Sequence, residues 1–269
     1  MNIGVFDSGL GGMAVLKEVI KALPQYNYIY YGDNIRAPYG NRSAQAIYEF
    51  TKNAVDFLVE KNCKLIIFAC NTVTITSLRK IQQEYLPKKY SHIKILGVVR
   101  PAVEEIRSLN AKKVGIIGTT ATIDSKQYIK EIKAILPEAT VYQKACPLFV
   151  PIIEEGKMNW RGLDLILKEY LRPLKQKRID SLILGCTHYI WIEGKIKKYL
   201  GDAVKVISQD GITATKLKNY LSRHPEIESN LDKNNQRTYY FSDLNNRYDK
   251  LIKTFLGSYL RDKDRVIQA

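Results

Sequence analysis

The feature that most constrains the fold is a regular alternation of short β-branched runs with longer amphipathic segments. The runs are too short to be helices and cover residues 3–6, 28–31, 65–69, 93–99, 113–117, 141–144, 181–185 and 204–208. The intervening segments 13–23 and 44–61 space their apolar residues as helices do. Strands that alternate with helices predict parallel strands joined by crossover helices, which is an α/β doubly wound architecture.

The chain also contains an internal repeat of strand-and-turn features. Residues 2–8 align with residues 113–119 at an offset of 111, and residues 65–72 align with residues 181–188 at an offset of 116. Because both features recur in the same order at nearly the same offset, we predict two similar doubly wound parallel-sheet domains. We expect a pseudo-twofold axis to relate them, with an active site in the cleft between them.

The C-terminal part of the chain is expected to return to the first domain. Residues 223–237 are polar and are predicted to form a surface connection, followed by a strand over 238–241 and a helix over 244–256. This tail is too short to be a domain of its own. The predicted first domain therefore comprises residues 1–98 plus 209–269, and the second comprises residues 99–208.

The composition is that of an ordinary globular protein, with 45% hydrophobic and 26% charged residues. The formal charge of +15 leaves open a nucleic acid, an anionic membrane surface, an acidic substrate or a solvated Lys-rich exterior. No apolar run reaches the roughly 18 residues of a membrane span, and no signal-like stretch precedes the first strand. We therefore expect a cytoplasmic protein that starts near Met1 and has no membrane partner.

Four cysteines, Cys63, Cys70, Cys146 and Cys186, are spread along the chain without CxxC spacing. They are too few for a disulfide scaffold in a chain of this length and carry no zinc signature, so we expect free thiols and no metal. Cys70 and Cys186 occupy equivalent positions in the repeat, each after a small residue and before polar ones. The other two have no such match, and we interpret them as structural.

Polar and reactive side chains directly follow three of the predicted strands. These segments are Asp7-Ser8, Cys70-Asn71-Thr72 and Cys186-Thr187-His188. Ligands of open α/β sheets bind beyond the carboxyl ends of the strands. If the two domains face each other, both cysteines line one crevice from opposite sides.

Two thiols on opposite sides of a crevice suit the inversion of a stereocentre. One proton must leave one face of the carbon while another arrives on the opposite face, so a thiolate and a thiol can exchange roles. A free thiol has a pKa near 8.5, and Asp7 and His188 are placed in the sequence to help form the thiolate. The competing interpretations are a helix N-cap for Asp7 and a structural histidine for His188.

The turn over residues 9–12, Gly-Leu-Gly-Gly, has two interpretations. It lacks the Lys-Ser/Thr ending of a P-loop and the full GxGxxG spacing, so it does not predict a nucleotide site. Its backbone N–H groups could bind a substrate carboxylate at a helix N-terminus, or the glycines could serve only a tight strand-to-helix turn.

Six ordered motifs resemble those of the glutamate racemases, the cofactor-independent enzymes that supply D-glutamate for peptidoglycan. The motifs occupy residues 4–12, 31–33 with 36–40, 69–72, 146–151 and 184–189, and a Phe-Leu-Gly at 255–257 resembles the C-terminal helix of the family. They run in order over most of the chain, and two of them contain Cys70 and Cys186.

The resemblance implies a role for each matching residue. Cys70 would remove the α-proton of D-glutamate and Cys186 that of L-glutamate, assisted by Asp7 and His188 respectively, while Glu154 resembles a further acidic helper. The implied substrate-binding residues are Asp7, Ser8, Tyr39, Gly40, Asn71, Thr72, Thr187 and His188. The resemblance also implies a homodimer and no pyridoxal phosphate.

Three departures from the family pattern stand out. Ile190-Trp191 replaces the usual proline after His-Tyr, and Arg100 stands before Pro101 where Glu or Gln is more usual. An N-terminal extension associated with control by a peptidoglycan precursor is also missing, so we do not expect that form of activation.

Two other functions compete with glutamate racemisation. A related racemase acting on aspartate or another amino acid is the first, although residues 7–9 and 38–40 resemble the glutamate enzymes more closely. A secondary DNA- or gyrase-binding role is the second, motivated by the basic stretches 168–178 and 195–198. Their charges alternate with apolar residues at helical spacing, so we interpret both stretches as solvated helix faces and expect no nucleic-acid partner.

Overall fold

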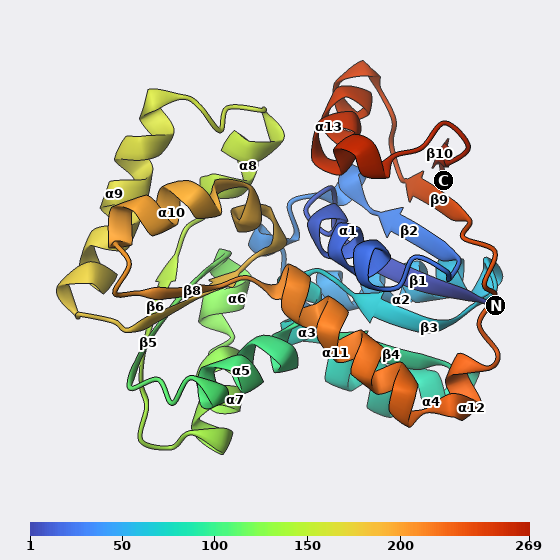
Figure 1. The fold of residues 1–269 in the computed structure, drawn as a ribbon, viewed down its shortest axis with the longest axis horizontal. Coiled ribbons are helices and arrows are strands. Elements are labelled where there is room, and N and C mark those ends of the chain that lie inside the picture. The colour runs from blue at the N-terminus through green and yellow to red at the C-terminus, as the bar shows by residue number, and fades with distance from the viewer.

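The computed structural model describes all residues from 1 to 269 and contains two parallel sheets (Figure 1). The larger sheet has six strands in the order β10-β9-β2-β1-β3-β4, and every neighbouring pair is parallel. Its strands are β1 (Asn2–Asp7), β2 (Tyr28–Gly32), β3 (Cys63–Phe68), β4 (Lys94–Gly97), β9 (Arg237–Phe241) and β10 (Arg265–Gln268). The C-terminal segment therefore extends the sheet that the N-terminal segment begins.

The smaller sheet repeats the central part of the larger one. Its four parallel strands lie in the order β6-β5-β7-β8, which matches the order β2-β1-β3-β4 strand for strand. The strands are β5 (Lys113–Gly118), β6 (Thr140–Ala145), β7 (Ser181–Gly185) and β8 (Lys205–Ile207). The sequence repeat pairs β1 with β5 and β3 with β7, so the expected architecture of two similar parallel sheets is confirmed.

Helices cover both faces of each sheet. Around the larger sheet these are α1 (Met13–Ala22), α2 (Ala44–Glu60), α3 (Asn71–Lys80), α4 (Leu86–Lys89), α11 (Gln209–Arg223), α12 (Pro225–Glu228) and α13 (Asn246–Leu256), with a π-helical turn at Ile81–Tyr85 joining α3 to α4. Around the smaller sheet they are α5 (Val99–Ser108), α6 (Thr120–Asp124), α7 (Gln127–Ile135), α8 (Phe149–Glu154), α9 (Arg161–Gln176) and α10 (Glu193–Leu200). Short 3-10 turns occupy Asn34–Arg36, Tyr39–Asn41, Thr187–Ile192 and Gly257–Tyr259.

Local sequence explains where several elements begin and end. Helix α2 begins after Ser43, whose hydroxyl accepts a hydrogen bond from the backbone N–H of Ala46. Helix α1 ends at Ala22, just before Pro24. Helix α13 begins after Asn245, whose side chain caps two backbone N–H groups.

The apolar core is divided among three clusters. One of 44 residues includes residues of both sheets and of α1, α9 and α11, while clusters of 16 and 13 residues fill the opposite faces of the larger and smaller sheets. The chain crosses from one sheet to the other twice, between β4 and α5 and between β8 and α11. Figure 1 shows α11 lying against α1, beside the larger sheet.

Two details differ from the sequence-based prediction. The strand expected over 93–99 is shorter, because Val99 already begins α5. Strand β10 was not expected at all; it is four residues long, carries Arg265 and Gln268 at its ends, and forms only because it can pair with β9 at the edge of the sheet. In addition, no helix has the length and apolar character required to cross a membrane.

Candidate active site

The two matched cysteines occupy equivalent positions at the carboxyl ends of the central strands. Cys70 lies two residues after β3 and is the N-cap residue of α3. Cys186 directly follows β7 and precedes the 3-10 turn Thr187–Ile192. Both thiols are almost fully buried, and none of the four cysteines forms a disulfide. Each sulfur therefore lies at a helix N-terminus, where a developing negative charge is favoured.

Both cysteines line a single small cavity between the two sheets. Of the residues predicted for the site, those lining this cavity are Ser8, Tyr39, Gly40, Asn71, Thr72, Glu154, Thr187 and His188, together with Cys70 and Cys186. The cavity has a volume of about 20 Å³, which is room for little more than one water molecule. The structure therefore represents a closed arrangement of the cleft.

The Cys70 side of the cavity is built from the strand ends of the larger sheet. The sulfur of Cys70 lies 3.5 Å from the hydroxyl of Ser8. Burial, reinforced by the nearby carboxyl of Asp7, raises the pKa of the Cys70 thiol to about 12. In this closed cavity Cys70 is therefore a neutral thiol at pH 7.

The Cys186 side contains an imidazole in place of the hydroxyl. The Nδ1 atom of His188 lies 3.9 Å from the sulfur of Cys186, and its Nε2 atom lies 3.0 Å from Oε1 of Glu154. Burial opposes a charge on His188, but the hydrogen bonds to Cys186 and Glu154 outweigh it and raise the His188 pKa well above its ordinary value. The protonated form of His188 is therefore favoured, and in that form the ring can donate one hydrogen bond to each neighbour.

Asp7 connects the two sides of the cavity by hydrogen bonds and forms none with Cys70. Its carboxylate accepts hydrogen bonds from the backbone N–H of Gly9 at 3.0 Å and from the hydroxyl of Thr187 at 3.2 Å. Complete burial raises its pKa, and His188 partly offsets that shift. The alternative role as the N-cap of α1 is wrong, because Gly12 occupies that position.

The glycine turn over 9–12 allows the two halves of the molecule to approach closely. A Cβ atom on Gly11 would lie 2.5 Å from both Nδ1 of His188 and Oγ1 of Thr187. A Cβ on Gly12 would lie 2.5 Å from the Cβ of Asp7. Real Cβ atoms do not approach other atoms this closely, so glycine is required at both positions. This close approach of the two halves is what the structure shows for the turn.

Asn71 and Thr72 bind residues that sequence reasoning missed. The Thr72 hydroxyl lies 2.9 Å from that of Thr119, and Oδ1 of Asn71 accepts hydrogen bonds from the Tyr128 hydroxyl and from the amide of Gln209. Thr119 and Gln209 follow β5 and β8, so the rule that selected the other strand-end residues could have found them. Tyr128 lies within α7, and no local signal marks it.

Comparison with known proteins shows which family has these features. The family model described as Asp/Glu/Hydantoin racemase matches residues 3–215. The chain belongs to this racemase family. A glutamate racemase of Aquifex aeolicus is 38% identical over 98% of this chain and 97% of its own length.

Two crystal structures of racemases share the fold over the whole chain. Glutamate racemase from Francisella tularensis, solved in complex with D-glutamate, has a TM-score of 0.88 and 34% identity, and the match covers 100% of this chain and 97% of that one. The RacE1 isoform from Bacillus anthracis has a TM-score of 0.89 and 32% identity with the same coverage. The two-sheet architecture is thus the fold of glutamate racemases.

Two of the departures from the usual racemase motifs, at Trp191 and at Arg100, can be located in the structure. The indole of Trp191 stacks on the ring of Phe255 with centroids 4.3 Å apart, which connects the segment behind Cys186 to α13. Arg100 is exposed and pairs with Glu104 and Glu131 at 3.2 and 3.4 Å. Neither residue lines the cavity that contains the cysteines.

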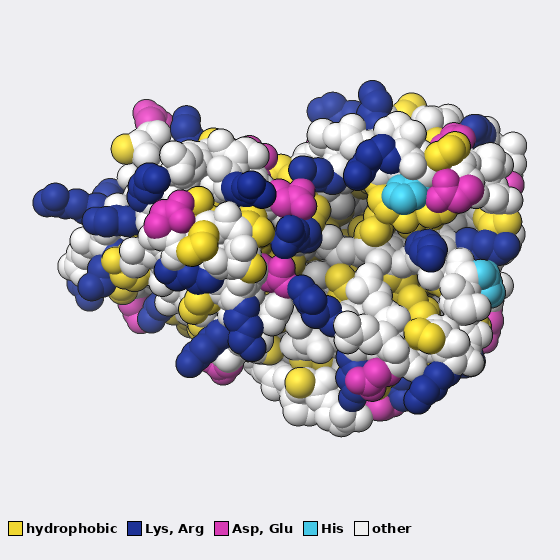
Figure 2. Space-filling view, turned by 90° about the horizontal axis from the view of Figure 1, so that it is seen from below, with side chains coloured by type: hydrophobic (Ala, Val, Ile, Leu, Met, Phe, Trp, Pro, Cys, Tyr) yellow, Lys and Arg dark blue, Asp and Glu magenta, His cyan; other side chains and the backbone are white.

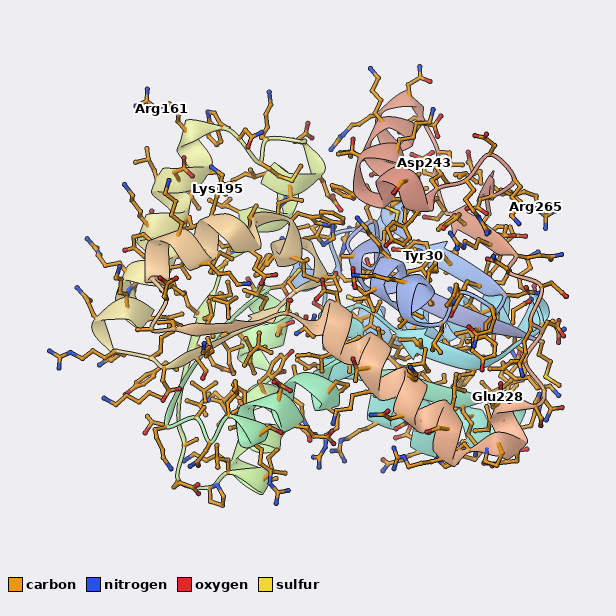
Figure 3. The ribbon with its side chains drawn as sticks, viewed as in Figure 1. Tyr30, Arg161, Lys195, Glu228, Asp243 and Arg265 are labelled. Carbon is orange, nitrogen blue, oxygen red and sulfur yellow. The ribbon has the colours of Figure 1, made fainter.

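The excess positive charge of this racemase is spread over its surface. In Figure 2 Lys and Arg side chains are scattered over both lobes with Asp and Glu among them. In the basic stretch of α9, Leu167, Leu171 and Leu174 are buried, and on α10 Lys195 pairs with Asp164 at 2.7 Å. Figure 3 shows Arg161 at the periphery of the molecule, whereas Tyr30 lies inside it. These stretches are solvated faces of packed helices.

The side chain of Tyr30 is hydrogen-bonded to the glycine turn over residues 9–12. Its buried hydroxyl donates a 2.7 Å hydrogen bond to the carbonyl of Gly9.

The two unmatched cysteines, Cys63 and Cys146, are also buried. Cys63 lies against Gly4, and the backbone carbonyl of Cys146 accepts a hydrogen bond from the Tyr189 hydroxyl. Neither lines the cavity between the sheets.

Proposed function

We propose that this racemase interconverts L- and D-glutamate with Cys70 and Cys186 as its two bases, and so supplies D-glutamate for peptidoglycan. The observation that carries the proposal is the pair of buried thiols, one from each sheet, lining a single cavity. The relatives named above are glutamate racemases, and the Francisella tularensis enzyme was crystallised with D-glutamate.

The chemistry requires one thiolate and one thiol. With D-glutamate, the Cys70 thiolate removes the α-proton, and the electron pair of the C–H bond passes to the α-carbon as a carbanion. The Cys186 thiol then delivers its proton to the opposite face, which gives L-glutamate and leaves Cys186 as the thiolate. The reverse reaction exchanges the two roles, so atoms and charge balance in both directions.

Substrate binding has to produce the Cys70 thiolate. With a pKa of about 12, this thiol is almost entirely neutral at pH 7 in the closed cavity. The ammonium group of a bound amino acid places a positive charge near the sulfur where little water screens it. The Cys70 thiol therefore releases its proton to solvent as the substrate enters, and the opposite charge stabilises the thiolate. The same cation also acidifies the α-proton that must leave.

The groups that bind glutamate belong to both sides of the cavity. We assign the substrate contacts to Asp7-Ser8, Tyr39-Gly40, Asn71-Thr72 and Thr187-His188, and the proton-transfer assistance to Asp7, His188 and Glu154. A cavity of about 20 Å³ cannot contain glutamate, so the two lobes must separate for the substrate to enter. The parts that move are residues 1–98 with 209–269, and residues 99–208.

We further propose that the enzyme needs no pyridoxal phosphate and no metal, works in the cytoplasm and forms a homodimer. No group of three or more His, Cys, Asp or Glu side chains is arranged to hold a metal ion. Activity that survives dialysis against a chelator, without added pyridoxal phosphate, supports the first part. Light scattering after size exclusion measures the oligomeric state.

Circular dichroism of D- and L-glutamate solutions tests the central proposal. Starting from either enantiomer, the wild-type protein should bring the optical signal to zero, because the two enantiomers have equal free energy. Aspartate should give at most a small fraction of this rate. A protein that racemises aspartate but not glutamate would overturn the proposal.

A further inference from the structure

The side-chain amide of Asn71 is held in place by two residues that have no part in the proton transfers. Its Oδ1 atom accepts a 2.6 Å hydrogen bond from the Tyr128 hydroxyl and a 3.1 Å hydrogen bond from Nε2 of Gln209. Its Nδ2 atom donates a 3.2 Å hydrogen bond to Oε1 of Gln209. Gln209 also donates to the Tyr128 hydroxyl at 3.0 Å, which closes a ring of four hydrogen bonds.

A count of donors shows that this ring couples the orientation of the Asn71 amide to that of Gln209. Gln209 uses both of its N–H groups, Tyr128 uses its single O–H, and Asn71 uses both lone pairs of Oδ1 and one of its two N–H groups. Turning the Asn71 amide alone by 180° would set its N–H groups against the donating amide of Gln209 and its oxygen against the Gln209 oxygen. The second Nδ2–H of Asn71 is therefore the only donor that the ring leaves free.

The ring is built from segments that lie far apart in the sequence. Asn71 begins α3 next to Cys70, Tyr128 belongs to α7 beside the smaller sheet, and Gln209 begins α11 where the chain returns from the smaller sheet. All three side chains are buried, with 1%, 0% and 0% exposure. Buried polar groups that are all satisfied hold one arrangement firmly, because any broken bond leaves an unpaired group without water.

We propose that Tyr128 and Gln209 are positioning residues that direct the free Nδ2–H of Asn71 at a carboxylate oxygen of the substrate, next to its α-carbon. This rests on the proposed function, in which Asn71 contacts glutamate. Asn71 lines the cavity directly beside Cys70, so a donor there reaches the group attached to the carbon that Cys70 deprotonates. Neither Tyr128 nor Gln209 lines the cavity, so both act through Asn71.

The first test removes one hydroxyl. Tyr128→Phe should lower kcat/KM for glutamate about tenfold, mainly through a higher KM, because the Asn71 amide is no longer fixed. Tyr28→Phe is the matched control: the Tyr28 hydroxyl is equally buried and donates a 2.6 Å hydrogen bond to the Leu23 carbonyl, away from the cavity. Its kcat/KM should stay within twofold of wild type, whereas an equal loss in both variants would indicate general destabilisation and overturn the proposal.

A double-mutant cycle decides whether Tyr128 acts through Asn71. In an Asn71→Ala background, Tyr128→Phe should cause no further loss of kcat/KM, and Gln209→Glu, which replaces the donating amide, should behave in the same way. The same tenfold loss in both backgrounds would show independent action and overturn the proposal.

A measurement without turnover separates this proposal from the proposed function. The side-chain amide resonances of Asn71, identified by their absence from Asn71→Ala, should shift in Tyr128→Phe and stay unchanged in Tyr28→Phe. Unshifted resonances in Tyr128→Phe would overturn the positioning role even in an active enzyme. Failure of the wild-type protein to racemise glutamate would instead overturn the proposed function.

Discussion

The Cys70 and Cys186 sides of the cavity have the same backbone design and different electrostatic surroundings. Each thiol follows a central strand and precedes a helical turn. Cys70 has a hydroxyl and a buried carboxyl nearby, whereas Cys186 has an imidazole that is hydrogen-bonded to Glu154. Duplication of a fold can therefore place two thiols symmetrically, while the neighbouring side chains make their surroundings unequal.

Thermodynamics limits how the difference between the Cys70 and Cys186 sides can affect the kinetics. Because the enantiomers of glutamate have equal free energies in solution, kcat/KM must be the same in both directions, whatever the two thiols do. The difference between the two sides can appear only in the separate values of kcat and KM for each enantiomer and in the rates of isotope exchange. The pH dependence of these quantities can also differ between the enantiomers.

The largest effect is expected from removing either thiol. Cys70→Ser and Cys186→Ser should each lower racemisation by at least about a thousandfold, since a hydroxyl is a far weaker proton acceptor, and this corresponds to roughly 4 kcal/mol in the barrier. In deuterated water, Cys70→Ser should still exchange the α-proton of L-glutamate, and Cys186→Ser that of D-glutamate. Full turnover in either variant contradicts the two-base mechanism.

The next effect concerns the buried carboxyl on the Cys70 side. Asp7→Asn should lower kcat about a hundredfold, within the range for a group that assists proton transfer. It should also raise Tm at pH 7. Because burial raises the Asp7 pKa, the folded state binds its proton more tightly, so stability falls as the pH rises from the ordinary value of 3.8 through the native pKa. Thermal melts between pH 4 and 8 test the sign, and a lower Tm for Asp7→Asn would contradict it.

A methyl group added where the two sides of the cavity meet should lower activity by a smaller factor. Gly11→Ala places a Cβ 2.5 Å from His188 and Thr187, which holds the lobes apart and should lower kcat/KM about thirtyfold. Gly194→Ala is the control, since a Cβ there meets nothing within 4 Å. Steady-state kinetics of both variants measure the effect, and equal activities would show that close approach of the lobes is not needed.

The smallest effect on activity is expected from changing Glu154, the carboxyl group hydrogen-bonded to His188. Glu154→Gln should lower kcat about tenfold and move the alkaline limb of the pH profile to lower pH, because it removes a partner that raises the His188 pKa. His188 stabilises the fold fully below its unfolded pKa of about 6.5, and this contribution is lost as the pH rises through the higher native pKa. An unchanged pH profile would show that Glu154 does not control His188.

The strands, the repeat and the equivalent positions of the two thiols could be predicted because they depend on local pattern. Alternating apolar runs specify β3 and β7, and the matched Ala69-Cys70 and Gly185-Cys186 pairs specify where the thiols stand. The family motifs then supplied roles for the neighbouring residues. Strand β10 escaped prediction because a four-residue edge strand forms only when its partner β9 is already in place.

The sequence by itself determined most of the elements, their duplication and the equivalent positions of two thiols. Only the tertiary structure decided what each helper touches, because these contacts join residues far apart in the chain: Asp7 with Thr187 across 180 positions, Asn71 with Gln209 across 138 and Asn71 with Tyr128 across 57. The periodic spacing of apolar residues in the sequence indicates which face of a helix or strand is apolar. It does not record which buried polar groups will meet, since that depends on how the two sheets pack against each other.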